Sequence, residues 1–456
     1  MFSVFLVTPL KLMLLGLIAI LGFTILRYSW VAFSGEADRS RFIRSLLMTI
    51  SAVVVVIVSN HLLVFWAAWV SVSLCLHRLI LFYPNRARAQ LAAHKKFLLA
   101  RFSELLLAGA FVALYSQFNT PYISDITAQA ALLSHGTINL TIAAVLLALV
   151  ALIKCAQLPM HGWLIQVVEA PTPVSALLHA GIVNLGGILL LFFAPVLALC
   201  SLACWLVIVL AGVSTIIAGL VSTTRISVKV KLAWSTSSQM GLMLVEIALG
   251  LYEMALLHLF AHSFYKAYSF LNSGNTVNHY LAAKLAGEVK PKVGHWTASL
   301  VLSCLLLAIA QWQFAVMTSA AATMLVLFAL AALILPSLTR FDRAFVPRVI
   351  ITLLFAAGLL TLYTTAKHHL AVLVGLDTPL NIYADIFVAL LFASLFSLSI
   401  ALQYWPHIRW VKRLFIWLNA GAYLDEWATR LTLKWWPSES LIKLQHEQWQ
   451  EKPEAK

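Results

Sequence analysis

Long apolar runs recur along the whole chain, and they constrain its fold more than any other feature of the sequence. A run of about 20 apolar residues crosses the hydrocarbon core of a bilayer as a helix. The runs are continuous rather than alternating every second residue, which favours helices over a β-barrel. Hydrophobic residues make up 62% of the 456 positions. We predict an all-α polytopic membrane protein with about 13 transmembrane helices, near residues 8–30, 43–60, 62–83, 97–116, 138–166, 172–195, 197–222, 233–249, 251–272, 295–313, 315–336, 345–366 and 382–403.

The basic residues are distributed unevenly between the predicted loops. The net charge is +14, and Lys and Arg gather in alternate loops: at Arg39, Arg41 and Arg44; at Arg86, Arg88, Lys95 and Lys96; at Arg225, Lys229 and Lys231; at Lys284, Lys290 and Lys292; and at Arg340 and Arg343. The opposite loops have few, with Lys367 the main exception. Because cytoplasmic loops carry the excess of Lys and Arg, we expect a multi-pass protein of the cell inner (plasma) membrane. Its N-terminus would lie outside and its C-terminus in the cytoplasm. This distribution argues against a nucleic-acid surface.

Two regions differ in composition. Residues 1–404 contain no Gly/Ser linker and are predicted to form one transmembrane domain. Residues 405–456 form a tail in which the segments IRWVKRLFIWLNA and YLDEWATRLTLKWWP mix Trp with Lys and Arg at helical spacing. Such segments suit helices that lie in the headgroup region or dock a partner.

Lys154 is an anomaly, because it ends the otherwise uncharged run INLTIAAVLLALVALI. A buried ammonium is costly and marks a functional hypothesis by default. Pro159, Gly162, Pro171 and Pro173 follow it and predict a broken helix of the kind that forms ion sites in transporters. The alternatives are a lysine that reaches the interface or one that closes a structural ion pair.

Other ionisable residues lie in predicted spans. His179, in VSALLHAG, suits either a proton relay or a hydrogen-bonded structural histidine. His258, His262 and Lys266 are spaced i, i+4 and i+8, so they share one helix face. A zinc site there is disfavoured, since a lysine completes the row and no carboxylate follows in the HExxH arrangement.

Glu104 lies three residues after Arg101, so the two can pair on one helix face. That pair could be purely structural. Glu246 and Asp385 are weaker candidates, because no pattern supports them. Carboxylate, lysine and histidine groups on neighbouring spans predict a proton or cation path through a helical bundle. No nucleotide-binding, haem-binding or hydrolase motif occurs, so we expect a transporter subunit rather than an enzyme, with no cofactor and no metal of its own.

The stretch KCAQLPMHGW, followed by PTPVSALLHAG, resembles the signature of the antiporter-like subunits of respiratory complex I, especially subunit L, and of Mrp-type cation/proton antiporters. AWSTSSQMG and HLFAHSFYKAYSFLNSG are also similar to that family, and the resemblance runs from about residue 15 to 275. It implies that Lys154 is the central proton-carrying lysine and His179 a relay histidine. It also implies that His258, His262 and Lys266 belong to a polar axis, and that Lys229 occupies a family lysine position.

The departures from the family concern the partner of Lys154. The family has a W-E-G-x-G-L-C motif whose glutamate pairs with this lysine, but the corresponding run here is WVSVSLC, with Val70 at the glutamate position. RFSE matches a family R-x-G-D, so we expect Glu104 to be the remaining acidic partner. A later lysine motif resembling PPFAGFWSK is absent after residue 275, and the chain begins near the family's third helix, which implies a shortened version.

Two further segments, SLCLHRLILFYPNRARAQLAAHKKFLLARFSE and GAYLDEWATRLTLKWWP, are similar to the membrane subunits of the DAB-type inorganic-carbon transporters, the DabB subunits. This resemblance implies a soluble DabA-like partner that is similar to a zinc carbonic anhydrase. The partner would hydrate CO2 directionally, driven by proton or sodium flow through the membrane subunit. Three alternatives stay open: a pump subunit of an NADH:quinone oxidoreductase, a stand-alone cation/proton antiporter, and a non-conducting scaffold.

Overall fold

The computed structural model describes residues 3–84, 86–276, 281, 285, 291–314, 319–374 and 381–436. These residues form helices and two isolated β-bridges, as predicted for an all-α protein. The first part of the chain contains the helices α1 (Pro9–Ala32), α2 (Arg39–Val58), α3 (Leu62–Ile80), α4 (Ala87–Phe118), α5 (Ile123–Ala131), α6 (Ile138–Lys154), α7 (Gly162–Gln166), α8 (Thr172–Ala180), α9 (Leu185–Phe192), α10 (Ala194–Ala198), α11 (Ser201–Thr224), α12 (Val228–Ala248) and α13 (Tyr252–Leu271). The second part contains α15 (Val293–Phe314), α16 (Ala320–Leu338), α17 (Phe345–Val374), α18 (Ile382–Tyr404), α19 (Arg409–Asn419) and α20 (Glu426–Trp435).

The predicted spans correspond to helices, but the count of thirteen is not confirmed. Among the described residues, 10 helices are long and apolar enough to cross a membrane. The α6 helix has only 17 residues before the chain breaks after Lys154, and α12 and α13 carry polar residues along their length. The multi-pass membrane character of the chain is confirmed by the ten spans, and the fold is helical throughout the described part.

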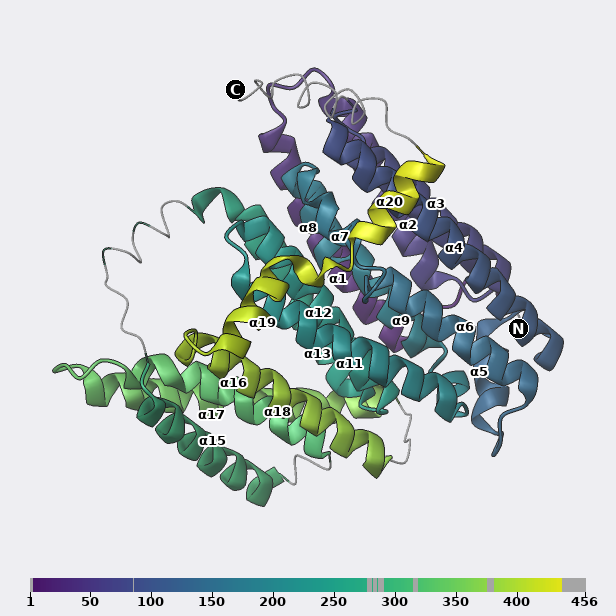
Figure 1. Ribbon diagram of the computed structural model, residues 1–456. Coiled ribbons are helices and arrows are strands. Elements are labelled where there is room, and N and C mark those ends of the chain that lie inside the picture. The colour runs from purple at the N-terminus through teal and green to yellow at the C-terminus, as the bar shows by residue number, and fades with distance from the viewer. Residues whose placement is uncertain are drawn as a thin grey trace, which may run out of the picture.

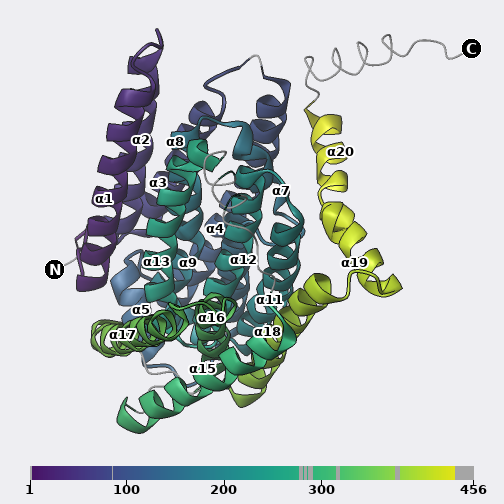
Figure 2. The same ribbon diagram turned by 90° about the vertical axis from the view of Figure 1, so that its left-hand side faces the viewer.

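The helices form two groups (Figure 1). The first group contains α1–α13, and α15–α18 form a second group that is inclined to the first (Figure 2). The two groups meet where α17 packs on α13 and α18 packs on α11. Large apolar side chains on the outside of the molecule, such as Phe23, Leu105 and Leu354, are exposed, as expected of surfaces that face lipid.

Two β-bridges identify one end of the first group. Phe5 pairs with Ser59, and His61 pairs with Tyr122, so the N-terminal segment, the α2–α3 junction and the start of α5 lie together. The opposite end carries the α1–α2 and α3–α4 loops, with Arg39, Arg41 and Arg44 at the start of α2 and Arg86 just before α4. We refer to it as the basic end. The tail helix α20 packs on α4 near this end, and α19 packs on α11 (Figure 2).

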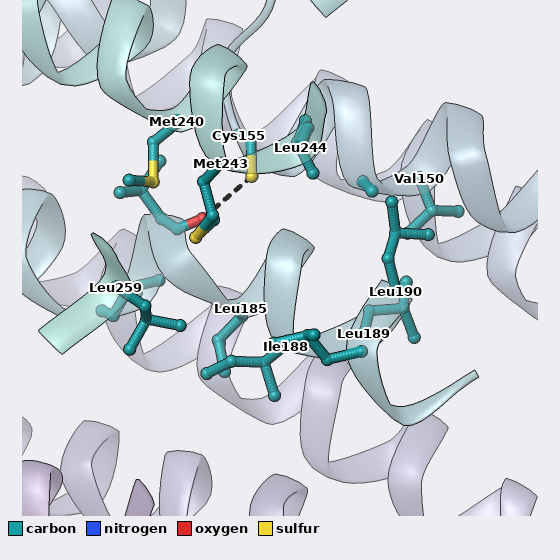
Figure 3. Close-up of a cluster of buried hydrophobic side chains, with 14 of the residues drawn as sticks. Val150, Cys155, Leu185, Ile188, Leu189, Leu190, Met240, Met243, Leu244 and Leu259 are labelled. Atoms are coloured by element: carbon teal, nitrogen blue, oxygen red, sulfur yellow. Dashed lines mark hydrogen bonds between the residues drawn. The ribbon is translucent and has the colours of Figure 1, made fainter. Parts of the chain in front are cut away.

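A tightly packed apolar core holds α6, α9, α12 and α13 together (Figure 3). Cys155 donates from Sγ to the carbonyl oxygen of Val183 over 3.4 Å. Gly186 and Gly187 let α9 approach α6 and α12 so closely that an added Cβ would collide with Cys155 and Met243. Small residues allow such close approach between helices in membranes. This core fixes the chain on both sides of the break after Lys154.

Candidate functional site

The chain breaks after α6 in the way that the prolines and glycine predict. Ala156 has a left-handed backbone (φ 52°), and α7 starts only at Gly162. Neighbouring helices satisfy the freed backbone groups: the Leu158 N–H donates to Ser214 Oγ (3.0 Å), and Ser237 Oγ donates to the Ala156 carbonyl (2.7 Å). A break in the membrane is tolerated when protein groups replace the missing helical hydrogen bonds in this way.

Lys154 lies at this break with its ammonium over an aromatic ring. Its Nζ is 4.7 Å from the centre of the Trp69 ring, and within the described part of the chain it makes no hydrogen bond or ion pair. Both residues line a cavity with about 20 Å³ of space for the centres of water-sized molecules, which is room for about one water. The cavity wall also includes Lys96, Ser103, Glu104, Trp163 and Ile182.

Glu104 lies in the wall of the same cavity and pairs with Arg101. The Arg101 Nη2–Glu104 Oε1 distance is 2.7 Å, and the Glu104 side chain is 5% exposed, so the predicted Arg101–Glu104 pair is confirmed. Arg101 also donates to Ser73 Oγ over 3.0 Å. Glu104 makes no direct ion pair with Lys154, although both line one cavity. Its role as acidic partner of Lys154 therefore stays a prediction.

Lys96 is a residue of this cavity that the sequence analysis assigned wrongly. We expected Lys95 and Lys96 in a loop before a span beginning near residue 97, but α4 begins at Ala87 and both lysines are buried within it. Lys96 Nζ donates to the carbonyl oxygen of Ser73 (2.5 Å) and to its Oγ (3.1 Å). The spacing of Lys96 and Glu104, eight residues apart, places them on one helix face and was the available signal.

His179 lies in the last turn of α8 and is fully buried. Its ring stacks on Phe270 at 4.4 Å between centroids. Neither ring nitrogen has a hydrogen-bond partner among the described residues. The relay role of His179 therefore stays a prediction, and its alternative is a structural histidine.

The face of α13 that carries His258, His262 and Lys266 points to the inside of the bundle. His262 and Lys266 are buried, and the His258 and His262 rings lie 6.2 Å apart. Lys266 Nζ donates to the Leu232 carbonyl over 3.0 Å and also to Ser235 Oγ. Both ring nitrogens of His262 lack a partner within the described residues. The three residues therefore form one row inside the protein.

An acid, Glu246, lies beside His258 at the end of this row nearest the start of α13. No pattern in the sequence supported it as a site residue. His258 lies between Glu246 (Nδ1–Oε2 3.0 Å) and Gln239 (Nε2–Oε1 2.8 Å). Glu246 is 3% exposed. No group of three or more His, Cys, Asp or Glu side chains that could hold a metal occurs in the described part of the chain.

A polar contact links the α13 row to the region of Lys154. Asn184, in the 3-10 turn Ile182–Asn184 between α8 and α9, donates from Nδ2 to Ser263 Oγ of α13 over 2.8 Å. Ile182 of the same turn lines the Lys154 cavity. The 3-10 turn Ile182–Asn184 thus contacts both α13, next to His262, and the Lys154 cavity.

Two other residues lie away from this axis. Lys229, at the start of α12, donates from Nζ to Thr172 Oγ1 at the start of α8 (3.0 Å), so it contacts the broken segment from the basic end. Asp385 accepts hydrogen bonds from the Ala320 and Ala321 N–H groups (2.6 and 3.0 Å) at the beginning of α16. Asp385 therefore caps a helix, which is the structural role of a buried carboxylate at a helix N-terminus.

The broken helix, its lysine and the buried polar row together define an antiporter-like membrane subunit. Residues 59–286, half of the chain, match the family model described as "NADH:quinone oxidoreductase/Mrp antiporter, TM". The structure is similar to a chain of the Mrp complex from Dietzia sp. DQ12-45-1b, with a TM-score of 0.59 and 19% identity over 92% of this chain and 52% of that one. This likeness shows the fold.

Sequence relatives identify the branch. The chain is 45% identical, over 95% of its length and 83% of the relative's, to the probable inorganic carbon transporter subunit DabB of Hydrogenovibrio crunogenus. It is 35% identical to DabB2 of Halothiobacillus neapolitanus over 94% of this chain and 80% of that one. Subunit L of the Escherichia coli NADH-quinone oxidoreductase is 33% identical over 59% of this chain and 44% of its own. The chain belongs to the DabB family of probable inorganic carbon transporter subunits, within the larger antiporter-like family.

Proposed function

We propose that this chain conducts protons across the cell inner membrane as the membrane subunit of an inorganic-carbon uptake complex. The observation that carries the proposal is a set of buried titratable groups: the Glu246–His258 pair and the rest of the α13 row, and Lys154 at the helix break. The turn that holds Asn184 and Ile182 joins the α13 row to the Lys154 cavity. The relatives' names supply the substrate class, because they are probable inorganic carbon transporter subunits. Hydration of CO2 would take place in a soluble DabA-like partner that resembles a zinc carbonic anhydrase.

The chemistry of the set favours protons over sodium. Sodium prefers several oxygen ligands, whereas lysine and histidine nitrogens bind and release protons. The two carboxylates of the set each contact a basic group, Glu104 with Arg101 and Glu246 with His258. In this function Lys154 alternates between ammonium and amine. His179 and the α13 row deliver protons to it, and the face of the Trp69 ring stabilises its charged form.

The test is Lys154→Ala in the complex of this chain with its soluble partner, produced in a host that lacks carbonic anhydrase. We expect uptake of labelled inorganic carbon to fall to background while the two subunits still co-purify. The matched control is Lys231→Ala, since Lys231 is exposed on α12 and should tolerate the change. Uptake that persists in Lys154→Ala would show that Lys154 is not on the energy path, as a non-conducting scaffold predicts.

A further inference from the structure

The Lys154 cavity contains more positive groups than acids. Lys96 and Lys154 line it, Arg101 borders it through Ser73 and Glu104, and Glu104 is the one carboxylate of this cluster among the described residues. With both lysines protonated, the four groups would carry a net charge of +2. Burying unpaired charge of one sign is strongly unfavourable. The cluster is therefore stable when one of the two lysines is neutral.

The two amines are surrounded differently. Lys96 Nζ faces two oxygen acceptors of Ser73, which hold an ammonium. Lys154 Nζ lies over the Trp69 ring and makes no hydrogen bond within the described part of the chain. A ring attracts a cation more weakly than oxygen acceptors do when both are buried. A proton that reaches Lys154 thus has a neighbouring amine site of comparable or better stability on the wall of the same cavity.

Beyond Lys96, two histidines lead toward the basic end. His77 lies in the last turn of α3, with its ring 5.3 Å from that of Phe97, the residue after Lys96. It follows Ser73, which accepts from Lys96, by four residues, so the two lie on one face of α3. His94 stacks on Trp436 of the tail, with 4.1 Å between the ring centroids. The Nδ1 atoms of both histidines are buried and have no hydrogen-bond partner in the described part of the chain.

We propose that Lys96 takes the proton from Lys154 and that His77 relays it to the basic end of the bundle, which completes the exit side of the path. In the transfer, one N–H bond of the Lys154 ammonium breaks and leaves its electron pair on Nζ, and the proton binds the lone pair of neutral Lys96. Lys154 becomes neutral and Lys96 charged, so the charge of the cavity does not change. This inference rests on the proposed function.

The decisive comparison is Lys96→Met against Lys96→Arg in the complex with the soluble partner. Arginine keeps a positive charge and donors for Ser73 but does not release its proton in proteins. If Lys96 carries protons, the initial rate of labelled inorganic-carbon uptake, normalised to assembled complex, falls at least tenfold in both variants. If Lys96 is only a fixed cation, Lys96→Arg keeps more than half of the rate, and the proposal is overturned.

His77→Gln tests the next step without touching the cavity. Glutamine keeps hydrogen-bonding groups but does not titrate, so we expect a fall of at least fivefold. The matched control His135→Gln changes an exposed histidine and should keep the full rate. A full rate in His77→Gln would remove His77 from the path. Lys154→Ala separates the two proposals: loss there with normal rates in the Lys96 and His77 variants refutes the exit path alone.

Discussion

At the scale of single residues, the environment of Lys154 suits the proton transfer that we propose for it. The family glutamate position holds Val70, and the ammonium lies over Trp69 instead. A carboxylate in direct contact would stabilise the ammonium form of Lys154 strongly, whereas the cation–π attraction of a ring face stabilises it by only about 0.5–2 kcal/mol. If Lys154 carries protons as we propose, the Trp69 ring would stabilise its charged form without holding it as strongly as a carboxylate would.

The first prediction concerns that ring. Trp69→Leu removes the aromatic face and should lower uptake about tenfold, since the charged form of Lys154 loses roughly 1–2 kcal/mol of cation–π attraction. Trp69→Phe leaves a similar gap but keeps a ring, so its rate should lie clearly above that of Trp69→Leu. Equal rates in the two variants would mean that packing, and not the ring face, is what Lys154 needs. Initial uptake rates of both complexes provide the measurement.

A second residue-scale prediction separates two roles of Glu104. Glu104→Gln keeps the shape of the side chain but removes the only described carboxylate of the cavity, which raises its positive charge and disfavours protonation of Lys154. We expect uptake to fall about tenfold or more, with Glu104→Asp retaining part of the rate. If Glu104 serves only to hold Arg101, thermal stability of the purified complex should fall while the uptake rate per assembled complex stays normal.

At the scale of elements, the tail is anchored beside the helix break. Asp425, just before α20, accepts from buried Lys95 of α4 (2.8 Å) and from Gln166 of α7 (3.0 Å). Gly162, the first residue of α7, is so close that an added Cβ would collide with the Asp425 carboxylate. Glycine at this position therefore permits the tail, α4 and the break to meet.

Asp425→Ala should release the tail. It leaves the Lys95 ammonium, which is 1% exposed, without its carboxylate, and we expect docking to weaken by about 1–3 kcal/mol. Limited proteolysis of the purified complex should then cleave near α20 several times faster. Glu426→Ala is the control, because its pair with Arg430 is on the surface and such pairs contribute little. Equal cleavage of the two variants would contradict the anchoring role.

The helices also show which residues of the site can be predicted from the sequence and which cannot. Periodicity and the prolines predicted the spans, the break at Lys154 and the shared face of His258, His262 and Lys266. Lys96 was missed because a lysine at the start of a span looks like a loop residue, and only the position where α4 begins shows its burial. Glu246 and Asp385 are equally buried acids, and their different roles depend on tertiary neighbours, His258 for one and the α16 N-terminus for the other.

At the scale of the whole molecule, the loops sort into two ends. The N-terminal segment and the start of α5 share one end through the β-bridges. The α1–α2 and α3–α4 loops, the arginines beside them and α20 of the tail lie at the other end. By the distribution of basic residues, the second end is predicted to face the cytoplasm. In the proposed function, that orientation would let protons enter from outside and leave beside the soluble partner.

Cysteine labelling checks this orientation in intact cells. In a background with the five native cysteines replaced by alanine, His135→Cys should react with a membrane-impermeant maleimide from outside. Gly35→Cys, in the α1–α2 loop where an added Cβ meets nothing within 4 Å, should react only after the membrane is permeabilised. The reverse result would place the tail outside and contradict both the predicted topology and a cytoplasmic partner.

The small size of the Lys154 cavity has a consequence for the membrane potential of the cell. A membrane potential of 100 mV amounts to about 2.3 kcal/mol per charge that crosses. An open column of water through the protein would let ions cross freely and dissipate this potential. A space that holds about one water is too small for such a column, so no open water path crosses the protein at this cavity. In the proposed function, protons would cross this region only when an amine accepts one and passes it on, so the complex would not drain the membrane voltage between transfer events.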